Sequence, residues 1–113
     1  MERHDWIKQF PAGILVCDCN GVILDMNDKS AKAHESDGGY ALVGKNLLDY
    51  RDETARVKIE KLLKTCEKNT YTIETDGIKT LIYQCPWFEQ GRYAGFVQLS
   101  LEIPFEMEHF VRP

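Results

Sequence analysis

The sequence predicts an α+β domain in which an antiparallel sheet carries its helices on one face. Two turns support this prediction, because Asn20-Gly21 and Asp76-Gly77 each separate two apolar, β-rich runs, which is a strong hairpin signal. A clear amphipathic helix lies between the two hairpins, over residues 52–67. Strands joined by tight turns pair antiparallel, and helices inserted between runs of strands are typical of an α+β architecture.

The first half of the chain is predicted to form a short helix, a hairpin and a second helix. Residues 5–10 favour a helix that ends at the following proline and glycine, since proline disfavours helix in the residue before it. Strands are expected over residues 13–18 and 22–26. Asn27 is a good N-cap for the next helix, which we expect to run to about residue 35.

The second half begins with the amphipathic helix and ends with three strands. The apolar positions of the helix share one face at a 3.6-residue period and are Ala55, Ile59, Leu62, Leu63 and Cys66. A hairpin over residues 70–75 and 78–87 and a last strand over residues 92–103 follow. Counting back from the hairpin turn pairs Glu74 with Lys79, which is a favourable cross-strand charge pair.

Length and charge limit the classes of function. A chain of 113 residues is expected to form one domain around a single hydrophobic core. Its net charge of −4 gives no basic surface for nucleic acid or an anionic membrane, and no apolar run approaches the ~20 residues that span a bilayer. The N-terminus lacks the pattern of a signal peptide. We therefore expect a cytoplasmic protein with free thiols that binds neither nucleic acid nor membranes.

Cysteine and histidine spacing argues against a metal site and against catalysis. Cys17-x-Cys19 has one residue too few between its members for the usual zinc pair, and no second pair accompanies it. We expect Cys17 to point into the core and Cys19 to lie in a turn. The histidines His4, His34 and His109 fall at a terminus, a helix end and the tail, without an evident nucleophile to activate. The sequence favours binding over enzymatic activity.

Several short motifs, taken in order, resemble a PAS domain. They are Gly13-Ile14-Leu15-Val16-Cys17-Asp18, Asn20-Gly21-Val22-Ile23, Met26-Asn27, Val43-Gly44-Lys45-Asn46-Leu47-Leu48 and Gly91-Arg92-Tyr93-Ala94-Gly95-Phe96-Val97. The resemblance implies a five-stranded antiparallel sheet that cradles short helices around a small cavity, in a sensory or protein-interaction module of the kind found in short single-domain bacterial PAS proteins. The expected organisation is an N-terminal cap helix over residues 1–10, the PAS domain over 11–104 and a C-terminal tail over 105–113.

The same resemblance gives expectations about cofactors. Flavin-binding LOV domains carry a reactive cysteine in a motif that corresponds to residues 46–51 here, and this stretch has no cysteine. Haem-binding PAS domains often ligate iron through a histidine of the long helix, and residues 52–67 contain none. We therefore expect no haem, flavin or zinc, and an unidentified small molecule as the ligand of the cavity.

The PAS pattern, together with strand register, places one set of side chains in that cavity. It puts alternate residues of the second hairpin and of the last strand on the inner face of the sheet. These ligand-pocket candidates are Tyr71, Ile73, Thr80, Ile82, Gln84, Phe96, Gln98 and Ser100. Pockets are typically apolar with a few placed polar groups, which this mixture matches. The alternative is that the polar side chains satisfy one another in a filled core, and the protein is a ligand-free adaptor for other proteins.

The opposite face of the last strand is too apolar to remain in water. Its residues alternate with the inner ones and are Tyr93, Gly95, Val97, Leu99, Leu101 and Ile103. Either the N-terminal helix covers this face with Trp6 and Phe10, or the same surface of a second subunit covers it. PAS relatives do both, and we expect a homodimer that engages an unknown signalling protein.

Overall fold

The computed structural model describes residues 5–113 and has a five-stranded antiparallel sheet in the order β2-β1-β5-β4-β3. The strands are β1 (Gly13–Asp18), β2 (Ile23–Met26), β3 (Asn69–Thr75), β4 (Ile78–Glu89) and β5 (Arg92–Ile103). The helices are α1 (Asp5–Lys8), α2 (Asp28–Ala33) and α3 (Glu53–Thr65), and the 3-10 turns η1 (Glu35–Asp37), η2 (Gly39–Leu42) and η3 (Leu47–Tyr50) connect α2 to α3. The predicted α+β class is confirmed, as are both ends of the last strand.

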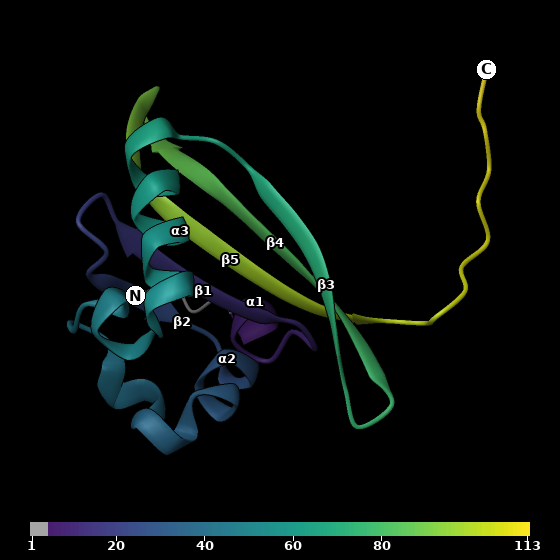
Figure 1. Ribbon diagram of the computed structural model, residues 1–113, viewed down its shortest axis with the longest axis horizontal. Helices are drawn as coiled ribbons and strands as arrows, with labels where there is room; N and C mark the ends of the chain where they lie inside the picture. The colour runs from purple at the N-terminus through teal and green to yellow at the C-terminus, as the bar shows by residue number, and fades with distance from the viewer. Residues whose placement is uncertain (1–4) are drawn as a thin grey trace.

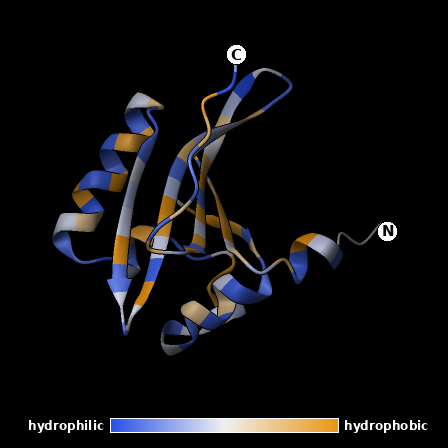
Figure 2. Cartoon of the chain, turned by 90° about the vertical axis from the view of Figure 1, so that its right-hand side faces the viewer, coloured by the Kyte–Doolittle hydropathy of each residue, from blue (hydrophilic) through white to orange (hydrophobic). Residues whose placement is uncertain are grey.

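The sheet has two unequal faces. Figure 2 shows α3 on one side of the sheet and the short α1 on the other. We call the side of α3 the inner face and the opposite side the outer face. Beyond β5 the chain runs on as an extended tail that leads away from the sheet (Figure 1), and its residues from Pro104 to Pro113 are exposed.

The β3–β4 hairpin follows the sequence-based register. Asp76 and Gly77 both have positive φ, 54° and 78°, as a two-residue turn of type I′ requires. The strands then pair as expected, with Glu74 opposite Lys79. The local chemistry of two turn residues is therefore enough to fix which side chains of both strands face inward.

The β1–β2 connection is looser than predicted. Gly21 has a positive φ of 90°, whereas Asn20 does not adopt one. The turn is held by the Asp18 carboxylate, whose Oδ1 accepts bonds from the backbone N–H groups of Asn20 (2.9 Å) and Val22 (3.0 Å). Val22 forms an isolated bridge with Asn46, so β2 begins one residue later than expected.

Helix α3 is shorter than the apolar period suggested. It begins after Asp52, whose side chain caps it by accepting from Ala55 N–H at 2.9 Å. The predicted place of Cys66 on the buried stripe is wrong, because Cys66 ends the helix in the left-handed conformation (φ 58°) and is exposed. Ile59 and Leu62 are the buried positions.

The hydrophobic core lies between the inner face of β1, β2 and β5 and the helical segments. Its members are Leu15, Cys17, Ile23, Met26, Ala31, Leu42, Leu47, Ile59, Leu62 and Phe96. Cys17 is fully buried and Cys19 is exposed, as expected from strand alternation. Burial raises the pKa of the Cys17 thiol to about 12, with a smaller contribution from the charge of Asp18.

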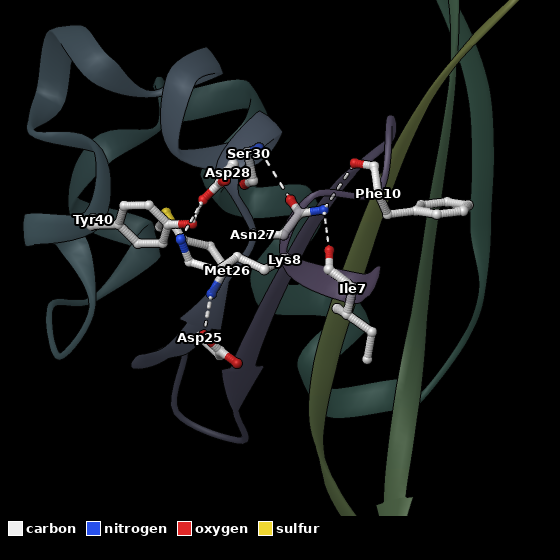
Figure 3. Close-up of polar contacts among 9 residues, drawn as sticks. All are labelled: Ile7, Lys8, Phe10, Asp25, Met26, Asn27, Asp28, Ser30 and Tyr40. Atoms are coloured by element: carbon white, nitrogen blue, oxygen red, sulfur yellow. Dashed lines mark hydrogen bonds and ion pairs between the residues drawn. The ribbon is translucent and has the colours of Figure 1, made fainter. Parts of the chain in front are cut away.

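Asn27 joins the N-terminal segment to the domain. Its side-chain oxygen accepts from Ser30 N–H (3.2 Å), which confirms the predicted N-cap of α2, and from Ile14 N–H (2.9 Å). Its amide nitrogen donates to the backbone carbonyls of Ala12 (2.7 Å) and Ile7 (3.1 Å), and Figure 3 shows the side chain reaching toward the Ile7 segment. With a longer bond to the Phe10 carbonyl (3.5 Å), a single buried side chain therefore holds five backbone groups in place.

The N-terminal helix is a weaker cap than expected. α1 is four residues long instead of spanning residues 5–10, and none of its residues is buried. Residues 1–4 of the predicted cap helix lie outside the described residues. Trp6 is 69% exposed and Phe10 is 41% exposed, so Trp6 leaves most of its surface in solvent and Phe10 a large part of it.

Candidate functional site

A pocket of about 720 Å³ lies between α3, the segment before it, and the inner face of β3, β4 and β5. Its lining contains six of the eight predicted residues, namely Tyr71, Ile73, Ile82, Gln84, Gln98 and Ser100. Tyr71 and Ile73 are about half exposed, at 43% and 46%, so the pocket is open on the side of β3. Pockets of this volume are typical of small-molecule sites.

Two predicted residues do not line the pocket. Phe96 is 2% exposed and belongs to the hydrophobic core, where it packs with Cys17 and Leu15. Thr80 has the expected inward register opposite Ile73 but lies nearer the hairpin turn, outside the pocket lining. The prediction that both side chains face inward was therefore right. The register alone did not show how far along the strands the pocket extends.

The buried polar groups of the pocket form a chain of amides. Asn69 Nδ2 donates to Gln84 Oε1 at 2.8 Å, and Gln84 Nε2 donates to Gln98 Oε1 at 2.9 Å. We call these three residues the amide triad. Gln84, the middle member, is only 4% exposed. Burying an amide costs free energy unless it forms hydrogen bonds, and Gln84 forms them with the two other members of the triad.

The Gln98 end of the triad, which we call its free end, faces the pocket, and at the other end Asn69 Oδ1 also has no hydrogen-bond partner within residues 5–113. Within residues 5–113, the amide nitrogen of Gln98 has no hydrogen-bond partner. No buried side-chain nitrogen or oxygen in the same residues lacks a partner, so this nitrogen is accessible. Because Gln98 lines the pocket, a bound molecule has a hydrogen-bond donor available to it there.

Basic side chains at the α3 end of the pocket were not anticipated from the sequence. Arg51, His34 and Lys58 all contribute to the lining. Burial lowers the pKa of the Arg51 guanidinium from its usual value. An arginine between a short turn and a helix normally indicates a solvated side chain, so the sequence carried no signal for its burial. Asn69 was also missed, although extending the hairpin register by one pair places it opposite Gln84.

The outer face is apolar and lacks a layer of its own. Val97, Leu99 and Leu101 all lie on it, as predicted, and each is partly buried. Their register partners on the flanking strands are also apolar or aromatic, including Tyr83 beside Leu99 and Leu81 beside Leu101. Side chains of the neighbouring strands therefore cover part of the surface of these residues.

Tyr93 does not share this face, and its predicted placement there is wrong. The β4–β5 register shifts between Trp87 and Phe88, so the alternation of β5 changes before Gly95. The Tyr93 hydroxyl instead donates to the backbone carbonyl of Leu63 in α3, at 2.8 Å. Gly95 itself has φ 152°, and a Cβ there would lie 2.0 Å from the Cys17 carbonyl oxygen, so only glycine fits.

The other features of residues 5–113 are weaker candidates for a functional site than this pocket. A second hollow of about 650 Å³ is lined by residues of the β4–β5 turn and by Asp18, but its turn residues Glu89, Gln90 and Arg92 are exposed. No group of three or more potential metal ligands is found in the described part of the chain. None of the helices described there is long and apolar enough to cross a membrane.

Comparison with solved structures identifies the fold. The PAS domain of the histidine kinase ThkA superposes with a TM-score of 0.65 at 16% identity, covering 80% of this chain and 97% of that one. The PAS domain of an HTR-like protein from Haloarcula marismortui gives 0.59 at 17% identity, covering 88% and 87%. This chain has the PAS fold. The fold predicted from the sequence motifs is thereby confirmed.

A third structural neighbour is larger than this chain. VqmA from Vibrio cholerae, studied there as a dimer without its target DNA, gives a TM-score of 0.68 at 14% identity. The match covers 89% of this PAS chain but only 51% of VqmA, so the chain spans about half the length of that neighbour. No family model matches the sequence, and no curated protein matches it either.

Proposed function

We propose that this protein is a sensory PAS module that binds a small apolar or amphipathic molecule in its pocket and passes the signal to an unidentified protein partner. The pocket of about 720 Å³, with the free end of the amide triad in its lining, is the observation that carries this proposal. The apolar side chains Ile59, Ile73 and Ile82 supply surface for the body of a ligand. The Gln98 amide supplies a polar contact that orients it.

The pocket argues for a sensor over a ligand-free adaptor. In a filled core the amide triad would be closed off by other side chains, and its members would satisfy only one another. The three amides do bond to one another. They are not closed off by other side chains, because open volume remains beside them. VqmA, which shares the fold, is also described in a complex with the small molecule DPO.

We also propose that the protein forms a homodimer through its outer face. Val97, Leu99 and Leu101 form an apolar surface that remains partly exposed, and a self-complementary surface suits a two-fold dimer. A net charge of −4 supports neither nucleic acid nor membrane as the alternative partner. The four cysteines are all unpaired, which is in keeping with a cytoplasmic location.

The proposed function is binding without catalysis and without haem, flavin or zinc. The most buried thiol, Cys17, has its pKa raised to about 12, the opposite of an activated nucleophile. His34 is the histidine in the pocket lining, and neither of its ring nitrogens is free for iron. Its Nδ1 bonds the Ser30 carbonyl at 2.9 Å and its Nε2 bonds Arg51 at 3.3 Å.

Native mass spectrometry tests the sensor proposal. Protein purified under mild conditions should carry a small molecule that is lost on denaturation, and Gln98→Leu should lower its occupancy because the polar contact is removed. Gln9→Leu is the matched control, since it makes the same change at an exposed position outside the pocket. If the wild-type protein carries nothing and binds nothing in a metabolite screen, the adaptor alternative is supported instead.

A further inference from the structure

The guanidinium of Arg51 forms no salt bridge within residues 5–113, although the charges of Asp37 and Asp52 lie near enough to offset part of the lowering of its pKa by burial. It donates from Nη1 to the Tyr50 carbonyl at 3.3 Å and from Nη2 to His34 Nε2 at 3.3 Å. Both bonds are long, and a guanidinium has five N–H donors. A largely buried charge is normally paired, because removing it from water otherwise costs free energy.

His34 cannot supply the missing charge. A backbone carbonyl only accepts hydrogen bonds, so the 2.9 Å contact with Ser30 requires that His34 Nδ1 carries a proton and donates. The Nε2 atom, which faces the Arg51 donor, is then the unprotonated acceptor. In this arrangement the imidazole is neutral. It positions the guanidinium without balancing its charge.

The rest of the pocket lining increases the imbalance. Lys58 adds a second positive charge and takes part in no salt bridge within the described residues. Asp52 is the one carboxylate in the lining, and its Oδ1 accepts from Ala55 N–H at 2.9 Å as the N-cap of α3. The pocket therefore presents two cations against one anion, and that anion is already engaged by the helix.

We propose that the ligand of this pocket is a monoanion whose carboxylate pairs with Arg51 while its apolar body packs on Ile59, Ile73 and Ile82. This inference rests on the proposed function, because it names the chemical class of the same ligand. The planar fork of a guanidinium matches a carboxylate through two parallel bonds, and one largely buried cation balances one negative charge. Lys58 then attracts the anion at the edge of the pocket, and the Gln98 amide contacts a polar group along its body.

Isothermal titration of the full chain with matched ligand pairs tests the inference. The probes are octanoate with octanamide, and indole-3-acetate with indole-3-acetamide, in which the amide keeps the shape and removes the charge. The wild-type protein should bind at least one carboxylate about tenfold or more tightly than its amide, as a charge-assisted pair predicts. Arg51→Gln should abolish this preference, because it weakens carboxylate binding more than amide binding.

A matched control separates the Arg51 contact from a general effect of charge. Arg56→Gln removes the same charge from α3, but Arg56 is exposed, lies outside the pocket lining and pairs with Glu60 at 3.9 Å. It should keep the full preference for the carboxylate. A circular dichroism spectrum checks the fold of Arg51→Gln, and Arg51→Lys, which keeps the charge without the fork, should show an intermediate preference.

The outcomes distinguish the inference from the function on which it rests. Equal affinity of the wild-type protein for the carboxylate and the amide overturns the monoanion and leaves the ligand-binding proposal standing. A carboxylate preference that persists undiminished in Arg51→Gln overturns the role of Arg51, whether or not other variants fold. If no member of either pair binds and native mass spectrometry finds no ligand, the proposed function fails and this inference fails with it.

Discussion

The inner and outer faces of the sheet carry different side chains beyond the hydrophobic core. The inner face, which α3 covers, carries the amide triad beside an open pocket. The outer face, which no helix layer of the described chain covers, carries Val97, Leu99 and Leu101. The inner face also carries the apolar core under the helical segments, and the amides lie beside that core at the pocket. The difference teaches that the inner face combines an apolar core with polar groups bonded to one another, whereas Val97, Leu99 and Leu101 give the outer face an apolar character.

The cost of this arrangement differs between the faces. On the inner face the amides offset the cost of burial by bonding to one another, so the pocket is stable without a ligand. On the outer face the apolar side chains shield one another only partly, and further burial gains about 25 cal/mol per Å². The polar groups of the inner face therefore satisfy one another, whereas the outer face would gain stability from a partner that covered it. Four experiments test that contrast.

The largest effect is expected from a charge on the outer face. Leu99→Glu should convert a dimer to monomers in sedimentation velocity, because burying an unpaired carboxylate costs on the order of 3–5 kcal/mol, about a hundredfold or more in the dissociation constant. Val57→Glu is the matched control, since Val57 is an exposed apolar residue of α3 and should leave the assembly unchanged. A Leu99→Glu protein that remains dimeric at the wild-type affinity would place the interface on another surface.

A large loss of stability is expected at the centre of the inner face. Gln84→Leu removes both bonds of the triad and strands Asn69 Nδ2 and Gln98 Oε1. At about 1–3 kcal/mol for each buried group left unpaired, the melting temperature should fall by on the order of 10 °C. Differential scanning calorimetry measures this fall. An unchanged melting temperature would mean that water replaces both bonds and that the triad contributes nothing to the fold.

A smaller loss is expected at the end of the triad. Gln98→Leu strands only Gln84 Nε2, so its effect on the melting temperature should be about half that of Gln84→Leu. The order of the two variants follows from the number of bonds in the triad, because Gln84 takes part in both and Gln98 in only one. The same calorimetric series checks it. A larger fall for Gln98→Leu would show that the end of the triad has a further buried partner.

The sequence predicted the inner face correctly where the residues of a turn fix the pairing of the strands. Asp76-Gly77 fixes the hairpin turn, and that turn alone specifies that Gln84 faces inward with Ile82. The place of Cys66 was mispredicted because the helical period does not show where a helix ends. The burial of Arg51 was missed for a different reason. It depends on how η3 and α3 fold over the sheet, which is a tertiary effect that no short motif encodes.

The smallest perturbation leaves the sequence intact and compares the thiols of the two faces. Cys17 lies on the inner face in the core, and Cys85 lies on the outer face opposite Val97. Burial raises the pKa of both thiols, that of Cys17 to about 12. Because thiolates are the reactive form, Cys17 should resist a thiol reagent at pH 8, and Cys85 should react more slowly than the exposed Cys19.

The oligomeric state should change the labelling rate of Cys85, and the pH should change that of Cys17. If a dimer covers the outer face, Leu99→Glu should speed the labelling of Cys85, measured by peptide mass spectrometry, and leave Cys17 protected. The folded-state pKa of Cys17 lies above the ordinary thiol value of ~8.5, so its contribution to stability is complete below that value and is lost as the pH rises toward about 12. Cys17 should become reactive only in that alkaline range, as the protein loses stability. Equal labelling of Cys85 in the wild-type and Leu99→Glu proteins would show that the outer face is open in solution, and rapid labelling of Cys17 at pH 8 would show that the inner face is not the closed side of this sheet.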